Sequence, residues 1–171
     1  MSLREKLDAV IDLRRVHEFE WLGMCFSEGL RFQGPAYTSS NFFLTEDAKV
    51  CNYVIKAKDE VIINYYGLHF NSNEWQRPNE FLPERFDISS PLYLTPSGKK
   101  RNPYSFTPFN GGRRGCIGQT FAEKNIKTVL CYMISYFDFE FADKDELKKP
   151  YPLLHLGQSK KVPIEVNVSN R

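Results

Sequence analysis

Apolar residues recur at helical spacing in three parts of the chain. The pattern covers residues 3–13, a segment from about residue 18 to residue 32, and a long segment that begins near Phe121. Side chains three or four positions apart share one face of a helix, so each segment is expected to pack by an apolar stripe. Gly34 and Pro35 follow the second segment and predict its end.

The stripes of the second and third helical segments can be read residue by residue. In the second helix the expected stripe consists of Trp21, Leu22, Cys25, Phe26 and Leu30. In the third helix it consists of Phe121, Ala122, Asn125, Ile126, Val129, Leu130, Met133, Ile134 and Phe137. Cys131 falls beside this last stripe and is interpreted as a packing residue. Both stripes are expected to face a core.

Short β-rich pieces, separated by Thr, Ser and Asn, replace the helical pattern between residues 36 and 68. Three strands and a turn at 56–59 predict a small antiparallel β subdomain. The predicted strands are Asn41–Leu44, Asn52–Ile55 and Val61–Tyr66. Prolines in residues 87–108 predict a meander without long regular structure. Terminal strands are predicted at 138–141, 153–156 and 162–168. The fold class is therefore mixed α/β and mainly helical.

Composition narrows the class of protein only slightly. The chain has 171 residues, of which 42% are hydrophobic and 26% charged, as in an ordinary globular domain or a piece of one. A formal net charge of +2 is too small to indicate a nucleic-acid partner. Aromatic residues make up 15% of the chain, which suits an apolar ligand site and an aromatic core equally well.

The four cysteines, at positions 25, 51, 116 and 131, form no C-x-x-C pair. They therefore indicate neither a zinc site nor a disulfide framework, and they favour a reducing compartment. No apolar run approaches transmembrane length, and the charged N-terminus resembles no signal peptide. We expect no membrane segment in this chain and an intracellular location.

The stretch 109–122 reads Phe-Asn-Gly-Gly-Arg-Arg-Gly-Cys-Ile-Gly-Gln-Thr-Phe-Ala. Cys116 precedes a helix N-terminus, whose unpaired N–H groups favour the thiolate, the form that binds metals. Gly112, together with the other two spaced glycines at 115 and 118, permits unusual backbone angles. Phe109 could shield the sulfur from water, and Arg114 could hold a carboxylate. These features suit a haem with a cysteine ligand. Cys116 alone would fit a buried structural cysteine in a tight turn.

The whole stretch resembles the haem-binding signature of the cytochrome P-450 superfamily, F-x-x-G-x-R-x-C-x-G-x-x-x-A. The matching positions are Phe109, Gly112, Arg114, Cys116, Gly118 and Ala122. The resemblance implies that residues 1–171 are the C-terminal portion of a single cytochrome P-450 domain. It implies haem b with Cys116 as the axial iron ligand. It also implies a haem-thiolate monooxygenase, which inserts one oxygen atom of O2 into a small organic substrate with electrons from a reductase.

Glu28 and Arg31 form an E-x-x-R pair on one face of the second predicted helix. Taken alone, such a pair is more often a solvated ion pair of little energetic value. The resemblance instead implies a buried pair, completed by Arg85 in the sequence Pro-Glu-Arg-Phe at 83–86, which holds the haem loop in place. A buried charge pair is costly to break from one side.

Several other residues leave alternatives open. His69 could be a ligand or an acid–base group, but packing as a polar loop residue is the simpler interpretation, and His155 is also interpreted as structural. The basic run Lys99-Lys100-Arg101 could face an acidic redox partner or be a solvated loop. By the resemblance, residues 33–40 border the substrate pocket. No basic residue follows at 38–42, where many family members carry one that binds a haem propionate.

The resemblance covers the C-terminal part of a family member. A long upstream helix with an acid–alcohol pair would precede it, and no Gly-x-Asp/Glu-Thr pattern occurs in the chain. Two hypotheses follow. The chain belongs to a monooxygenase that in full-length eukaryotic form could reside at the endoplasmic reticulum membrane. Alternatively, it is a truncated, inactive fragment that keeps the haem-loop scaffold without stable haem binding.

Overall fold

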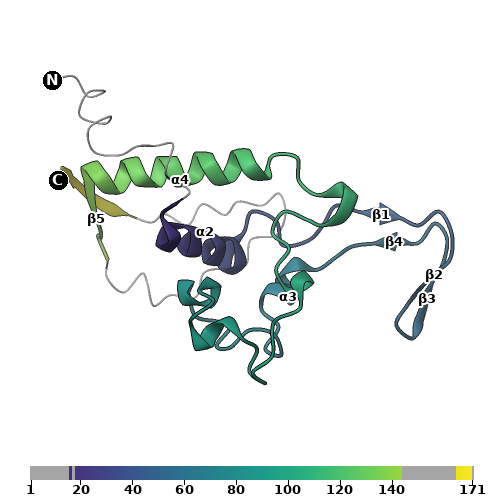
Figure 1. The fold of residues 1–171 in the computed structure, drawn as a ribbon. Coiled ribbons are helices and arrows are strands. Elements are labelled where there is room, and N and C mark those ends of the chain that lie inside the picture. The colour runs from purple at the N-terminus through teal and green to yellow at the C-terminus, as the bar shows by residue number, and fades with distance from the viewer. Residues whose placement is uncertain (1–15, 17, 144–164, 171) are drawn as a thin grey trace.

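The structure is a computed structural model, which describes residue 16 and residues 18–143 and 165–170. Figure 1 shows the long helix α4 (Gln119–Tyr136) above the shorter helix α2 (Glu20–Gln33). Helix α3 (Tyr65–His69) and short turns lie below α2, and the strands β1 to β4 form an arm that projects from this body. The fold is mixed α/β, and the longest described elements are helices. The predicted helix at 3–13 lies outside the described residues.

Helix α2 ends where the sequence predicts. Gly34 follows Gln33 in an extended conformation, with ψ 160°, because a residue before proline is disfavoured in the helical region. The predicted apolar stripe is only partly correct. Phe26 is buried together with Glu28 and Arg31, whereas Trp21 is 57% exposed. The helix thus places a charged pair inside, because that pair meets the loops at residues 69–86.

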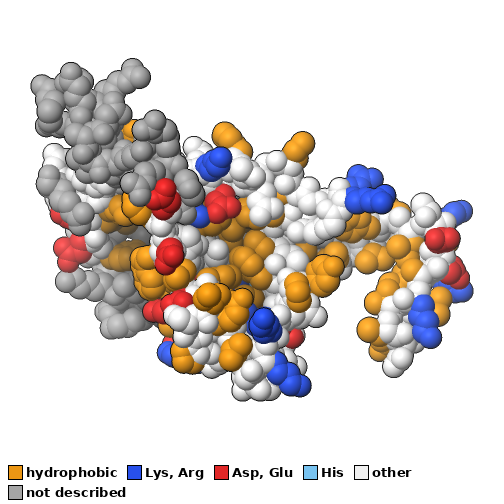
Figure 2. All heavy atoms as spheres, viewed as in Figure 1, with side chains coloured by type: hydrophobic (Ala, Val, Ile, Leu, Met, Phe, Trp, Pro, Cys, Tyr) orange, Lys and Arg blue, Asp and Glu red, His pale blue; other side chains and the backbone are white. Residues whose placement is uncertain are grey.

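The arm consists of two antiparallel ladders. Strand β1 (Phe42–Phe43) pairs with β4 (Glu60–Val61). Beyond it, β2 (Ala48–Val50) pairs with β3 (Tyr53–Ile55). Figure 1 shows this arm standing away from the main body, and Figure 2 shows hydrophobic side chains on its surface. The predicted turn at 56–59 connects the two ladders, and the backbone N–H of Lys56 donates to Asp59 there.

The strand predicted for Val61–Tyr66 is wrong after Val61. Residues Tyr65–His69 form α3 instead. The cause is local, because the side chain of Asn64 accepts a hydrogen bond from the backbone N–H of Gly67 and caps the helix. Such a cap satisfies an otherwise unpaired donor in the first turn. The β-branched and aromatic residues that suggested a strand are overridden by this cap.

Residues 70–118 carry short 3₁₀ turns rather than long elements. Three of these turns begin with a proline, whose fixed φ suits the first position of a helix. They are η2 (Pro83–Phe86), η3 (Pro91–Tyr93) and η4 (Pro103–Ser105). A fourth, η5 (Gly112–Arg114), lies inside the cysteine loop. The predicted meander at 87–108 therefore contains short 3₁₀ turns in place of long helices or strands.

Helix α4 is followed directly by strand β5 (Phe137–Phe141), which pairs with β6 (Val166–Asn170). The predicted strand at 153–156, including His155, lies outside the described residues. The buried residues of α4 are Lys127 and Cys131. The expectation that its apolar stripe faces a core is wrong for Phe121, which is 75% exposed, and for Val129, which is 47% exposed. Helix α2 packs against the side of α4 that carries Lys127, not against the side that carries Phe121 and Val129.

The centre of the body is Trp75, which is 1% exposed. The rings of Phe86 and Phe106 lie 6.0 and 6.1 Å from it. The indole N–H of Trp75 donates to the carbonyl oxygen of Leu68 at 3.0 Å. This aromatic core joins α3, the 3₁₀ turns and α2. Within the described ranges, no helix combines the length and apolarity that crossing a bilayer requires.

Candidate functional site

Glu28 and Arg31 lie one turn apart on α2 and form a bidentate ion pair inside the protein. The Nε atom of Arg31 donates to Glu28 Oε2 at 2.8 Å, and its Nη2 donates to Oε1 at 2.8 Å. Both side chains are fully shielded from solvent. The spacing in the sequence predicts that the two can meet, and the structure adds that they meet in the interior.

Arg85, in η2, completes the group. Its Nε donates to Glu28 Oε1 at 3.2 Å, and its side chain is also 0% exposed. The structure therefore brings together the three residues that the resemblance linked. Burial lowers the pKa of Arg85, Glu28 opposes this effect and Arg31 adds to it. The group, which we call the arginine network, consists of Glu28, Arg31 and Arg85.

The arginine network also binds the backbone of the loops around it. Arg31 donates to the carbonyl oxygens of His69 at 2.9 Å and of Pro78 at 3.0 Å. Arg85 donates to the carbonyls of Gln76 and Arg77. A loop buried without such donors would leave its carbonyl groups unpaired, which is costly. The two guanidinium groups thus hold irregular backbone in a fixed path below α2.

Arg101 belongs to the same interior and was missed by sequence reasoning. Its guanidinium lies 4.4 Å from the centre of the Trp75 ring, and it donates to the carbonyls of Leu92 at 2.9 Å and Arg85 at 2.5 Å. Burial lowers its pKa. Arg101 therefore fits neither a surface for an acidic redox partner nor a solvated loop, the two interpretations of the basic run. Lys99 and Lys100 are exposed. No spacing in the sequence could indicate this contact, because Trp75 and Arg101 are far apart in the chain.

His69, the last residue of α3, is 4% exposed. Its Nε2 accepts a hydrogen bond from the backbone N–H of Thr107 at 3.2 Å. Burial and the nearby Arg31 lower its pKa to about 4. The side chain therefore packs, as the simpler interpretation expected, although it does so in a helix rather than a loop. Among the described residues no group of three or more His, Cys, Asp or Glu side chains could hold a metal ion.

The cysteine loop, residues 109–118, is held mainly by backbone hydrogen bonds. The N–H of Cys116 donates to the carbonyl of Phe109 at 2.8 Å, and that of Gly115 donates to Gly112 at 3.2 Å. Gly112 has φ +65°, a conformation that favours glycine. The expectation of unusual backbone angles is wrong for Gly115 and Gly118, whose φ values are −55° and −87°.

Cys116 lies three positions before α4 begins at Gln119. The N-cap residue of α4 is Gly118, which makes no side-chain capping bond. The first N–H groups of the helix thus receive no side-chain acceptor from the N-cap position, which favours an anion nearby. The thiolate form of Cys116 remains a prediction. Gly118 lies next to the sulfur, because a Cβ atom there would be 3.8 Å from Cys116 Sγ. Half-buried Ala122 follows on α4, one turn after Gly118, and donates to its carbonyl.

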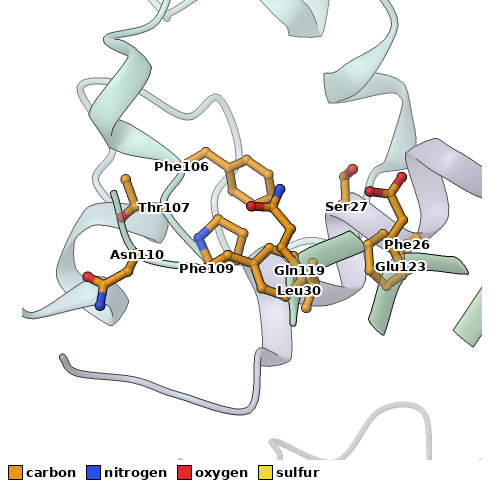
Figure 3. Close-up of a pocket in the computed structure, with 10 residues that line it drawn as sticks. Phe26, Ser27, Leu30, Phe106, Thr107, Phe109, Asn110, Gln119 and Glu123 are labelled. Atoms are coloured by element: carbon orange, nitrogen blue, oxygen red, sulfur yellow. The ribbon is translucent and has the colours of Figure 1, made fainter. Parts of the chain in front are cut away.

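The expected shielding of the sulfur by Phe109 is not found. Cys116 is exposed. Phe109 instead lines a hollow of about 190 Å³ between α2 and α4. Figure 3 shows its ring beside Leu30 and Gln119. The reason is that α2 offers an apolar surface on that side, so the ring packs against the scaffold and leaves the sulfur open to solvent.

Arg114 is exposed and lines a second, larger hollow of about 450 Å³ on the other side of the loop. This hollow is mainly apolar, with Phe42, Ile63 and Leu68 among its lining residues. Arg114 has no ion-pair partner in the part of the chain that the structure describes. That Arg114 holds a carboxylate stays a prediction. Thr107 and Asn110 line both hollows.

Comparison with known proteins identifies the family. The model of the cytochrome P450 family matches residues 3–167, and the chain belongs to this family. The family consists in general of haem-iron monooxygenases that use an organic substrate, O2 and a reductase. The loop and the arginine network described above lie within the matched region.

Curated relatives come from animals and plants. The chain is 31% identical over 159 residues to cytochrome P450 4F6 of Rattus norvegicus, covering 88% of this chain and 28% of that protein. It is 32% identical to tabersonine 16-hydroxylase 1 of Catharanthus roseus over 130 residues, which are 76% of this chain and 24% of the relative. It is 29% identical to steroid 17-alpha-hydroxylase/17,20 lyase of Felis catus over 153 residues, covering 85% of this chain and 29% of that protein. The chain thus spans less than a third of the length of these relatives.

Proposed function

We propose that this chain is the C-terminal portion of a haem-thiolate monooxygenase domain and that Cys116 is its axial haem-iron ligand. One observation carries the proposal. The sulfur of Cys116 is exposed on a loop that backbone hydrogen bonds hold directly before α4. A single thiolate donor on a loop whose residues Gly112 and Arg114 line a largely apolar hollow suits an iron porphyrin, whose nitrogens supply most of the other iron ligands.

The residues of the loop have separate roles in this proposal. Cys116 donates its electron pair to the iron, and Arg114 holds a carboxylate of haem b. Gly112 permits the left-handed turn, with φ +65°. Gly118 leaves room beside the sulfur, Phe109 anchors the loop to α2, and Ala122 continues the loop into α4. When bound, the haem supplies the oxygen-activating chemistry, which an electron-rich thiolate ligand favours.

The arginine network acts as a support in this proposal. Glu28, Arg31 and Arg85 touch none of the residues 109–118 through a hydrogen bond described above, so their contribution is positional. The guanidinium nitrogens of Arg31 and Arg85 donate to Glu28 or to carbonyl oxygens of the loops. Because the loops at 69–86 cannot move without breaking these bonds, the segment leading to Cys116 starts from a fixed position.

The names of the relatives indicate only a broad class of substrate. Two of the relatives are named as hydroxylases, one of tabersonine and one of a steroid. By analogy we propose that the partners are a small organic substrate, O2 and an electron-donating reductase, and that no nucleic acid is among them. We propose no membrane-spanning segment within the described residues. The exposed Lys99 and Lys100 could contact an acidic reductase surface. In a full-length eukaryotic protein the site could be at the endoplasmic reticulum membrane.

A second candidate is an inactive fragment that keeps the scaffold without stable haem binding. One observation favours it. Apolar residues of α4 are exposed, including Ile126 at 41% and Met133 at 40%. We infer that this chain would enclose only one side of a haem bound at Cys116. Binding by one side alone buries less apolar surface and is correspondingly weaker.

Haemin titration of the 171-residue chain separates the two candidates. We expect weak binding and, after reduction and addition of CO, the red-shifted Soret band of a thiolate-ligated iron. Cys116→Ser should abolish this band, while Cys51→Ser, which alters another exposed cysteine, should retain it. A Cys116→Ser chain that keeps the band would refute the ligand assignment. Absence of any binding by the wild-type chain would favour the inactive fragment.

A further inference from the structure

Helix α3 contacts the segment that leads into the cysteine loop at two points. We propose that Tyr65 and His69 form a clamp on residues 106–110 and that this clamp positions Cys116. The two residues face the same segment from one short helix, a turn apart. The inference rests on the proposed function for its consequence at the haem, but the clamp itself can be tested without a haem.

The first contact is made by His69. Its Nε2 accepts from the N–H of Thr107 at 3.2 Å, and its ring lies 5.4 Å from that of Phe106. The same residue accepts a hydrogen bond from Arg31 through its backbone carbonyl at 2.9 Å. His69 therefore connects the arginine network directly to the segment before Cys116. A protonated Nε2 could not accept this bond, and burial beside Arg31 favours the neutral ring.

The second contact is made by Tyr65, which is 4% exposed. Its hydroxyl donates to Oδ1 of Asn110. Asn110 has φ +69°, a left-handed conformation that asparagine adopts more readily than most residues. The hydroxyl of Tyr65 thus ties down the side chain at the point where the backbone turns towards Gly112.

The two contacts enclose the backbone group that fixes Cys116. Phe109 lies between Thr107 and Asn110, and its carbonyl accepts the N–H of Cys116 at 2.8 Å. Thr107 and Asn110 also line both hollows beside the loop, so this segment is the wall between them. If it moved, the carbonyl of Phe109 would move with it and the sulfur would lose its position relative to Arg114.

Amide hydrogen exchange of residues 106–118 in the 171-residue chain tests the clamp directly. In His69→Phe, which keeps an aromatic ring but removes the acceptor, we expect exchange in this segment to rise about tenfold. His69→Gln keeps an acceptor at a similar reach and should stay near the wild-type rate. An unchanged rate in His69→Phe, or an equal rise in both variants, would overturn the clamp.

A second pair of variants keeps the test valid if His69→Phe does not fold. Tyr65→Phe removes only the hydroxyl, and Asn110→Gly removes its acceptor while suiting the positive φ. Both should raise exchange at 106–118 and leave exchange of α2 unchanged. No rise in either variant would contradict the proposal.

The link to the haem is read from the ferrous–CO spectrum of the same variants. His69→Phe and Tyr65→Phe should lower the thiolate-type Soret band at a fixed haemin concentration, and His69→Gln should restore it. If exchange responds but the band also survives Cys116→Ser, the clamp stands and the proposed function fails. If Cys116→Ser abolishes the band while exchange ignores both clamp variants, the function stands and the clamp fails.

Discussion

The arginine network and the cysteine loop differ in how completely this chain surrounds them. Glu28, Arg31 and Arg85 are at most 1% exposed, and their charges meet one another and nearby carbonyls. Cys116 and Arg114 are exposed. Charges can be buried only where partners are at hand, so the network needs all its partners within the chain. The side chains of Cys116 and Arg114 stay in contact with water, so they need no such partners within the chain.

This difference separates support from reactivity. The network organises loops by satisfying carbonyls, and removing one member leaves unpaired charge in the interior. The cysteine loop is organised by its own backbone hydrogen bonds and by α3, so its exposed side chains can be changed without that cost. Variants that affect stability should therefore cluster in the network, and variants that affect haem binding alone should cluster in the loop.

The largest effect is expected from Glu28→Ala, which leaves Arg31 and Arg85 buried without their carboxylate. The free energy of unfolding should fall by about 3–5 kcal/mol, measured as the midpoint of urea denaturation. Lys56→Ala provides the matched control, since Lys56 pairs with Asp47 at the surface with 69% of its side chain exposed, and it should leave the midpoint unchanged. Equal effects of the two substitutions would erase the distinction between the two regions.

The next effect concerns pH. The pKa of His69 is lowered from 6.5 to about 4 in the fold, so between these values the unfolded chain binds more protons than the folded one. Stability should therefore decrease as pH falls from about 6.5 towards 4, by about 3 kcal/mol in total for this group. His69→Gln should remove that part of the pH dependence. Denaturation midpoints of both chains across this range check it, and parallel curves would contradict it.

A smaller loss is expected from Arg101→Met. The substitution keeps the apolar stem but removes the charge above Trp75 and the hydrogen bonds to Leu92 and Arg85. We expect about 2 kcal/mol of destabilisation. Lys100→Met, at the exposed neighbouring position, should be silent in the same measurement. If Lys100→Met proved the more damaging of the two, the interior role of Arg101 would be wrong.

The smallest effect on stability is expected at the cysteine itself. Cys116→Ser should leave the unfolding midpoint unchanged, because the thiol is exposed, while it abolishes the haem band. Cys131→Ser should lower stability by about 1 kcal/mol, because it places a hydroxyl at a position that is 4% exposed. A destabilised Cys116→Ser chain would show that the loop is as structural as the network.

Predictions from the sequence succeeded where the interaction is local. The end of α2 before Pro35 follows from residues adjacent in the chain. The meeting of Glu28 with Arg31 follows from helical spacing. Trp21 was expected to be buried and is exposed, and Tyr65 and Tyr66 were expected to end the strand that starts at Val61 but begin helix α3. The first error arises because periodicity reports which residues share a face, not what that face meets, and the second arises because the cap by Asn64 overrides the β propensity of the residues after it.

The sequence by itself determined helices α2 and α4 and the family to which the chain belongs, since each depends on residues a few positions apart. Only the tertiary structure decided that Arg101 covers Trp75, that His69 binds Thr107 and that Phe109 turns to α2 rather than to the sulfur. These contacts join residues distant in the chain. Their energies depend on burial and on the partners that folding brings within reach.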